Sequence, residues 1–167
     1  MAHDKVGTDG EGGMEAAGLS GAPWRKALTL DVMLPADPSH LDLPELQLIA
    51  DNLPVLCWVA RGDGYIFWYN RRWHDYCGST EESMAGWGWQ SVHDPDKLPE
   101  VLERWTASIA SGEAFEMIFP LRGADGKFRP FLTRAVPLRD ASGAIVRWFG
   151  TNSDVSAQIA AEQALAS

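Results

Sequence analysis

The stretch GADGKFRPFLTRAVPLRDASGAIVRWFGTNSDVS, residues 123–156, has the clearest pattern in the chain. Two runs of β-favouring side chains, 127–140 and 144–152, are separated by the turn-forming triplet Ala-Ser-Gly. The pattern then changes to SAQIAAEQALAS, which favours a helix with Asp154 or Ser156 as its cap. The sequence therefore predicts a last strand that runs directly into a helix.

The segments before this stretch predict the rest of a sheet and the helices beside it. Residues 114–122 alternate large apolar side chains with others, as in a strand with one buried face. Two further β-rich runs flank Gly-Asp-Gly at 62–64, which is a hairpin signal. The predicted helices cover residues 43–54, 71–78, 79–86 and 93–112. The last of these has Asp94 as its expected cap and Pro95 at its first position. This order predicts an α+β fold with a five-stranded antiparallel sheet and short helices on one face.

Composition and charge narrow the possible partners. The chain has 167 residues, a formal net charge of −9 and a sequence pI of about 4.8, so it is poorly suited to attract nucleic acid. Its two cysteines, Cys57 and Cys77, lack metal-ligand spacing, and we expect no metal site. No apolar run is long enough for a membrane span, and no secretory leader is evident, so a cytoplasmic location is expected.

The chain is expected to have three parts. Residues 1–42 are predicted to be a flexible N-terminal arm, glycine-rich at its start, with a possible short packed segment. Residues 43–153 are predicted to form the folded domain. Residues 154–167 are predicted to begin a C-terminal helix that leaves it.

Two motifs in the sequence resemble motifs of the PAS family. VHDPDKL at 92–98 resembles the start of the long helix in one PAS subclass, and 123–156 resembles that subclass's closing motif. The resemblance covers about residues 43–158. It implies a signalling role in which Asp154 couples the sheet to an output helix. The parent protein that the resemblance implies is a sensor histidine kinase of a bacterial-type two-component system.

Two prolines depart from the family pattern. Pro120 stands where an arginine is frequent, and Pro130 stands where a tryptophan is usual. Proline lacks the N–H that a strand donates, so Pro120 predicts an edge strand. Pro130 is expected where its missing N–H is not needed, or at a bulge.

Large aromatic side chains and methionines suggest a pocket inside the cup. The candidate pocket residues are Trp73, Tyr76, Met84, Trp87, Trp89, Trp105, Met117 and Trp148. They could line a cavity for a planar or apolar small molecule, or they could simply fill the core. Both interpretations stay open at this point.

The sequence gives little support for the cofactors that PAS domains are known to bind. The segment MAGWGWQSVHD before the long helix lacks the cysteine that a flavin–cysteine adduct needs, and residues 96–111 lack the histidine that haem-binding members use. His74 and His93 are weak haem candidates. The cofactor is therefore left unknown, and no catalytic set is evident.

We expect a non-catalytic sensory module that binds a small ligand or a partner. It would form a homodimer and relay its state to a C-terminal effector domain, for which the resemblance implies a histidine kinase. Two alternatives remain, namely a ligand-free dimerisation module and a small α+β cup enzyme. The enzyme would need an acid–base pair in the pocket, such as a histidine beside a carboxylate.

Overall fold

The computed structural model describes residues 44–167, with side chains from residue 47. The predicted N-terminal arm, 1–42, lies outside the described residues. The helices are α2 (Pro44–Asp51), α3 (Arg71–Cys77), α4 (Glu81–Met84), the 3₁₀ helix η1 (Gly88–Val92), α5 (Leu98–Ser111) and α6 (Ser156–Ala166). The strands are β1 (Leu56–Arg61), β2 (Ile66–Tyr69), β3 (Phe115–Arg122), β4 (Phe128–Arg139) and β5 (Ile145–Asp154).

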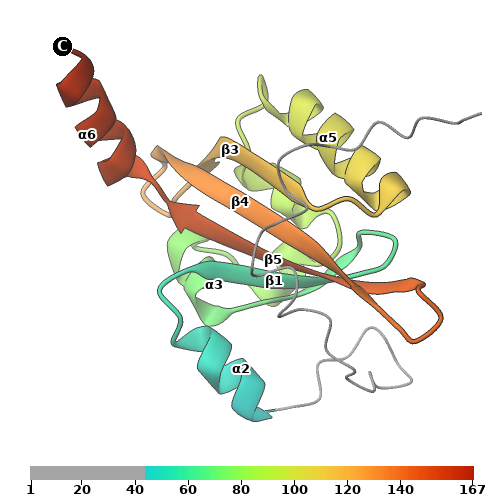
Figure 1. Ribbon diagram of the computed structural model, residues 1–167. Coiled ribbons are helices and arrows are strands. Elements are labelled where there is room, and N and C mark those ends of the chain that lie inside the picture. Colours follow the sequence, from blue (N-terminus) through green and yellow to red (C-terminus); the bar gives the residue numbers. More distant parts are fainter. Residues whose placement is uncertain (1–43) are drawn as a thin grey trace, which may run out of the picture. The chain divides into compact units, whose positions relative to one another are not determined.

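The strands form one five-stranded antiparallel sheet in the order β2-β1-β5-β4-β3. The central strand is β5, and it continues almost directly into α6, which projects from the end of the sheet (Figure 1). This arrangement confirms the predicted fold class of an α+β domain with five antiparallel strands.

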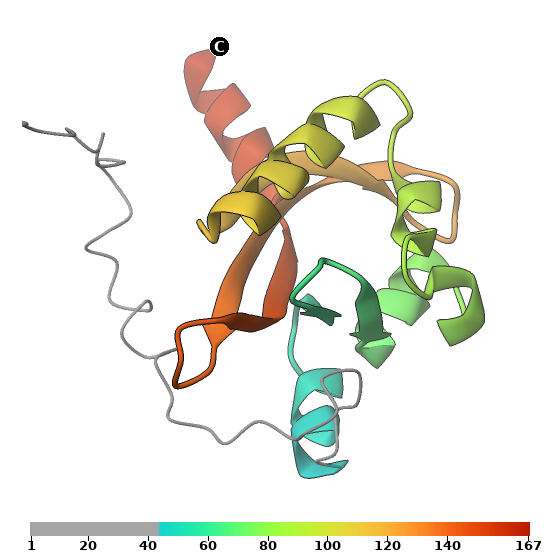
Figure 2. The ribbon, with the colours of Figure 1, turned by 90° about the vertical axis from the view of Figure 1, so that its right-hand side faces the viewer.

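Helices α3, α4, η1 and α5 cover one face of the sheet (Figure 2). The strand side chains on that face alternate with those on the other. In β3, for example, Phe115, Met117, Phe119 and Leu121 are all buried against the core. Helix α5 contributes the buried Val101 and Trp105, one turn apart on the same side. The sheet and these helices therefore enclose a single core.

A glycine in the central strand makes room for the largest side chain of its neighbour. Gly150 of β5 stands directly opposite Trp58 of β1 and beside Ala135 of β4. A Cβ atom on residue 150 would overlap the indole of Trp58. The small residues at 135 and 150 thus allow the Trp58 ring to lie against the sheet.

Both prolines occupy positions where the sheet does not need their N–H groups. Pro120 lies on the edge strand β3, as expected, and stands opposite Pro130 of β4. The β4–β5 ladder ends at the pair Phe131–Asp154, next to Pro130, whose carbonyl accepts a 3.0 Å bond from the Val155 N–H. Because β5 leaves the sheet there, the missing N–H of Pro130 costs no ladder bond.

The long helix starts later than the sequence suggested. Its first residue is Leu98, and its N-cap is Lys97, which makes no side-chain cap bond. The expected cap, Asp94, instead accepts a 2.9 Å bond from the N–H of Asp96 within a preceding turn. The reason is tertiary, because His93 is held in an extended conformation by a bridge to Leu121 of β3. The chain must turn before the helix can begin.

Candidate functional site

A small cavity lies between the sheet and the helices. Its volume is about 40 Å³, and every side chain around it is buried. It is lined by Trp58, Ile66, Trp73, Trp89, His93, Val101, Trp105, Phe115, Phe119, Thr133 and Asn152. Pockets for drug-sized ligands measure roughly 300–1,000 Å³. Most of the cup is therefore filled by the protein's own side chains.

Edge-on aromatic packing around Trp105 explains why so little space remains. Its ring centroid lies 5.6 Å from that of Trp58, 5.7 Å from that of Phe115 and 5.1 Å from that of Trp148. These are favourable T-shaped contacts, each with an interplanar angle above 70°. Trp105 fixes one wall of the cavity because it is held by three rings from three strands.

A chain of buried hydrogen bonds forms the sheet side of the cavity. The indole Nε1 of Trp58 donates to Oδ1 of Asn152 at 2.9 Å, and Nδ2 of Asn152 donates to Oγ1 of Thr133 at 2.5 Å. These residues belong to β1, β5 and β4, so the bonds cross three neighbouring strands. The polar atoms of these three side chains are bonded to one another, so they leave few hydrogen-bonding groups for an occupant of the cavity.

Three other lining residues have polar atoms without partners. Trp73, Trp89 and His93 are each at most 5% exposed. Among the described residues, Nε1 of Trp73, Nε1 of Trp89 and Nδ1 of His93 find no hydrogen-bond partner. Burial lowers the pKa of His93 to about 4, so its imidazole is neutral near pH 7. The cavity wall is thus uncharged and almost entirely apolar, because these polar atoms are themselves covered by neighbouring atoms.

The structure places only three of the eight sequence-predicted pocket residues in the cavity wall, namely Trp73, Trp89 and Trp105. Met84, Met117 and Trp148 are buried in the same core but do not line the space. Trp87 is 46% exposed and lies on the surface, two positions before Trp89 in the sequence. The two rings still contact each other, with centroids 6.2 Å apart, but only the ring of Trp89 is buried in the core. Contact of any of these residues with a ligand stays a prediction.

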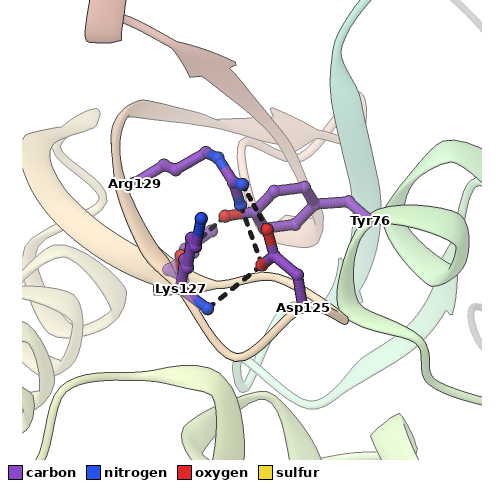
Figure 3. A network of polar contacts seen from close by, with 5 residues as sticks. Tyr76, Asp125, Lys127 and Arg129 are labelled. Carbon is purple, nitrogen blue, oxygen red and sulfur yellow. Dashed lines mark hydrogen bonds and ion pairs between the residues drawn. The ribbon is translucent and has the colours of Figure 1, made fainter.

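Tyr76 does not line the cavity and instead joins a polar network at the β3–β4 turn (Figure 3). Its hydroxyl donates to the carbonyl of Leu121 at 2.7 Å. In the same network Arg129 forms an ion pair with Asp125, and this bond lowers the pKa of Asp125 to about 2. The carboxylate of Asp125 also accepts the N–H of Lys127 at 3.0 Å. Tyr76 therefore anchors α3 to the turn and is not a cavity wall.

Sequence reasoning missed most of the sheet residues around the cavity. Trp58, Phe115, Phe119, Thr133 and Asn152 all point to the helix-covered face. Strand alternation predicted one common face for Phe115, Met117 and Phe119, but it did not indicate that the two phenylalanines border a pocket. No local signal pairs Asn152 with Trp58, because they are 94 positions apart.

An open groove of about 400 Å³ lies on the outer side of Asn152, so this residue contributes to the walls of both spaces. The groove is also lined by Tyr76, Phe131 and Asp154. Asp154 is the last residue of β5, and its Oδ1 accepts a 2.8 Å bond from the Ser156 N–H. Asn152, in the wall of the cavity, is therefore four positions before the first residue of α6.

The predicted helix cap has a different geometry from the expected one. Val155 is the N-cap residue of α6 and makes no side-chain cap bond. Asp154 bonds the N–H and the hydroxyl of Ser156 from one position earlier, as an aspartate does in a tight turn. None of the residues of α6 is buried, and Leu165 is 89% exposed.

The thiols show no sign of activation. Burial raises the pKa of Cys57 and of Cys77 to about 12, which keeps both protonated near pH 7. Neither sulfur lines the cavity. Within residues 44–167, no group of three or more histidine, cysteine or acidic side chains could hold a metal ion. No helix in that range is long and apolar enough to cross a membrane.

Comparison with known proteins agrees with this geometry. A family model described as PAS fold matches residues 50–160, about two thirds of the chain. The chain belongs to the PAS fold family. The solved PAS domain of a protein from Colwellia psychrerythraea superposes with a TM-score of 0.57 at 16% identity, covering 68% of this chain and 96% of that one.

Two further proteins that this chain resembles are named as histidine kinases. The peroxide stress-activated histidine kinase mak1 of Schizosaccharomyces pombe is 38% identical over 123 residues, which is 73% of this chain but only 7% of mak1. The chain therefore spans a small part of that kinase. A sensory box histidine kinase/response regulator from Burkholderia thailandensis has a TM-score of 0.53 at 20% identity, covering 72% of this chain and 92% of that structure.

Proposed function

We propose that this PAS domain is a sensory module that relays the state of its core cavity, through β5 and α6, to a C-terminal effector. The observation that carries the proposal is the continuity of the path. Asn152 forms part of the cavity wall, Asp154 ends the same strand, and α6 follows at Ser156. A change in the cavity thus acts on β5, the strand that sets the direction of α6.

The exposure of α6 supports an interaction of this helix with another chain or domain. None of its residues is fully buried within the domain, and a helix of 11 residues is marginally stable in isolation. Pairing with α6 of a second copy would stabilise it, so we propose a homodimer in a cytoplasmic signalling protein.

A histidine kinase is the effector that we propose. The similarity to part of mak1 supports this class of parent protein. The spacing between sensor and kinase then becomes testable, because each residue inserted into a continuous helix rotates whatever follows by about 100°.

The test joins the 167-residue chain, through α6, to the dimerisation helix of a histidine kinase, with one to seven residues inserted after Ala166. We expect autophosphorylation to rise and fall with a period of about 3.6 inserted residues. Glycine insertions of the same lengths serve as the control and should abolish the period. Activity that is independent of the insertion length would contradict the relay.

A further inference from the structure

The surface of the core cavity consists almost wholly of aromatic and aliphatic carbon atoms. Resting on the proposed sensory function, we propose that this cavity binds a small apolar molecule, of the size of dioxygen or xenon, and that Trp58 passes its presence to β5. Three observations support this, namely the chemistry of the wall, the size of the space and the position of Trp58 between the cavity and β5.

The wall offers almost no hydrogen-bonding atoms to an occupant. Thr133 and Asn152 are bonded to each other, and Asn152 also accepts an indole N–H. The indole nitrogens of Trp73 and Trp89 and Nδ1 of His93 are covered by neighbouring atoms. A buried water needs roughly two to four polar partners, which this wall does not present. We therefore expect the cavity to be dry.

An apolar molecule is the occupant that such a wall favours. Wall atoms that border a gap lack partners for dispersion contacts, and an apolar occupant supplies them. A polar molecule of the same size would give up its hydrogen bonds to water without replacing them. An ion would lose still more, because no wall side chain is an aspartate, glutamate, lysine or arginine, and burial lowers the pKa of His93 to about 4.

The size of the cavity limits the occupant further. Its volume of about 40 Å³ exceeds the roughly 10–15 Å³ that one water requires, and is far below the roughly 150 Å³ of a cavity that accommodates benzene. The occupant therefore has about two or three non-hydrogen atoms, or is one large atom such as xenon. The rings of Trp58, Trp105 and Phe115 fill the space that a larger apolar ligand would need.

Trp58 lies between the cavity and the strand that leads to α6. Its ring lines the cavity, and its Nε1 donates to Oδ1 of Asn152 in β5 at 2.9 Å. The same ring occupies the space over Gly150 of β5, where a Cβ atom would overlap it. An occupant that shifts the Trp58 ring therefore acts on β5 at two positions before Ser156, where α6 begins.

The experiment follows the whole chain by NMR, with ¹³C-labelled isoleucine and valine methyl groups and ¹⁵N-labelled tryptophan. Xenon under pressure should cause saturable shifts at the methyl groups of Ile66 and Val101, which line the cavity. The indole N–H of Trp58 should shift with the same saturation. The methyl signals of Ile118, which is 54% exposed on β3, should show no saturable shift.

Two further probes distinguish an apolar site from other kinds of site. Dioxygen is paramagnetic, so in the cavity it should speed the relaxation of the buried Ile66 methyl group more than that of the exposed Ile118. Formamide is similarly small but polar, and should bind at least about tenfold more weakly than xenon. Nuclear Overhauser contacts between a long-lived water and the Ile66 methyl group should be absent.

Matched variants at two valines test whether the cavity itself is the site. Val101→Ile adds a methylene group at the wall and should weaken xenon binding at least about fivefold. Val136→Ile makes the same change at a buried valine of β4 that does not line the cavity, and should leave binding unchanged. Val101→Ala enlarges the space and should retain xenon binding. The comparison of probes in the wild type does not depend on any variant folding.

Several outcomes would overturn the inference. No saturable xenon shift, equal affinity for formamide, or a long-lived water beside Ile66 would each contradict an apolar site. Unchanged xenon binding in folded Val101→Ile would place the xenon elsewhere, and binding without a shift at Trp58 would refute the role of that residue. If the kinase fusion keeps its periodic insertion series in these cases, the ligand class fails and the relay stands. Xenon binding with a flat insertion series would show the reverse.

Discussion

Trp58 and Asn152 form a buried hydrogen bond of 2.9 Å between the first strand and the last, at the edge of the cavity. Asn152 passes the contact on to Thr133 of β4. The side-chain amide of Asn152 therefore connects β1, β5 and β4 near the end of β5, where that strand leaves the sheet. It is the one wall residue of the cavity that also borders the outer groove.

Replacing Asn152 tests this connection. Asn152→Ala leaves the Trp58 indole N–H without its acceptor, and we expect a loss of about 2–3 kcal/mol in the free energy of unfolding. Asn52→Ala is the control, because Asn52 is exposed and bonds only within its own segment, to Leu48. Urea unfolding of a double-mutant cycle with Trp58→Phe should give a coupling of at least about 1 kcal/mol. Additive effects would show that the bond contributes little.

The aromatic core should depend on Trp105 and not on Trp87. Trp105 is 5% exposed and packs against three rings, so Trp105→Ala should lower the free energy of unfolding by about 3–5 kcal/mol. Trp87→Ala should change it by less than about 1 kcal/mol, because that side chain is 46% exposed. Equal losses on chemical denaturation would place Trp87 in the core as well.

Stability should fall in acid because of His93. Its folded-state pKa, about 4, lies below the ordinary value of 6.5, so the unfolded chain takes up a proton first as the pH falls. The contribution is complete above about pH 6.5 and is lost towards pH 4, by up to about 3 kcal/mol. His93→Gln removes the titrating group. Urea unfolding near pH 7 and pH 4 should therefore show a smaller loss in the variant, and an equal loss would refute the assignment.

The Asp154 junction should matter more for signalling than for folding. Asp154→Ala removes the bond to the Ser156 N–H and should cost about 1 kcal/mol. It should also disturb regulated autophosphorylation in the kinase fusion, because α6 would no longer start at a fixed angle. Both effects are measured at a matched folded fraction.

Asp140 provides an internal control for that experiment. Its Oδ1 accepts the N–H and the hydroxyl of Ser142 in the β4–β5 turn, which is the pattern that Asp154 makes with Ser156. Asp140→Ala should cost a similar free energy and leave regulation unchanged. If the kinase fusions that carry either variant show the same regulated autophosphorylation as the wild type, the signal leaves the domain by another route.

Local patterns in the sequence were sufficient for the strands, the α-helices and their order, but not for the 3₁₀ helix η1. Alternation at Phe115–Leu121 and the glycine turns predicted the strands, and Pro120 predicted the edge position of β3. These features depend on side chains close together in the chain, so a sequence displays them directly. The same reasoning failed at Asp94, because the bridge between His93 and Leu121 delays the helix.

The size of the cavity and the residues of its wall were determined by the tertiary structure. Its wall joins residues far apart in the chain, such as Trp58 and Asn152, and its size depends on how Trp105 packs among rings from three strands. Composition showed that many aromatic side chains were available, but not which would face inward. Trp87 and Trp89 differ by two positions and lie in opposite environments, one on the surface and one in the wall. Burial of a side chain depends on what packs over it, and only the folded chain brings those partners together.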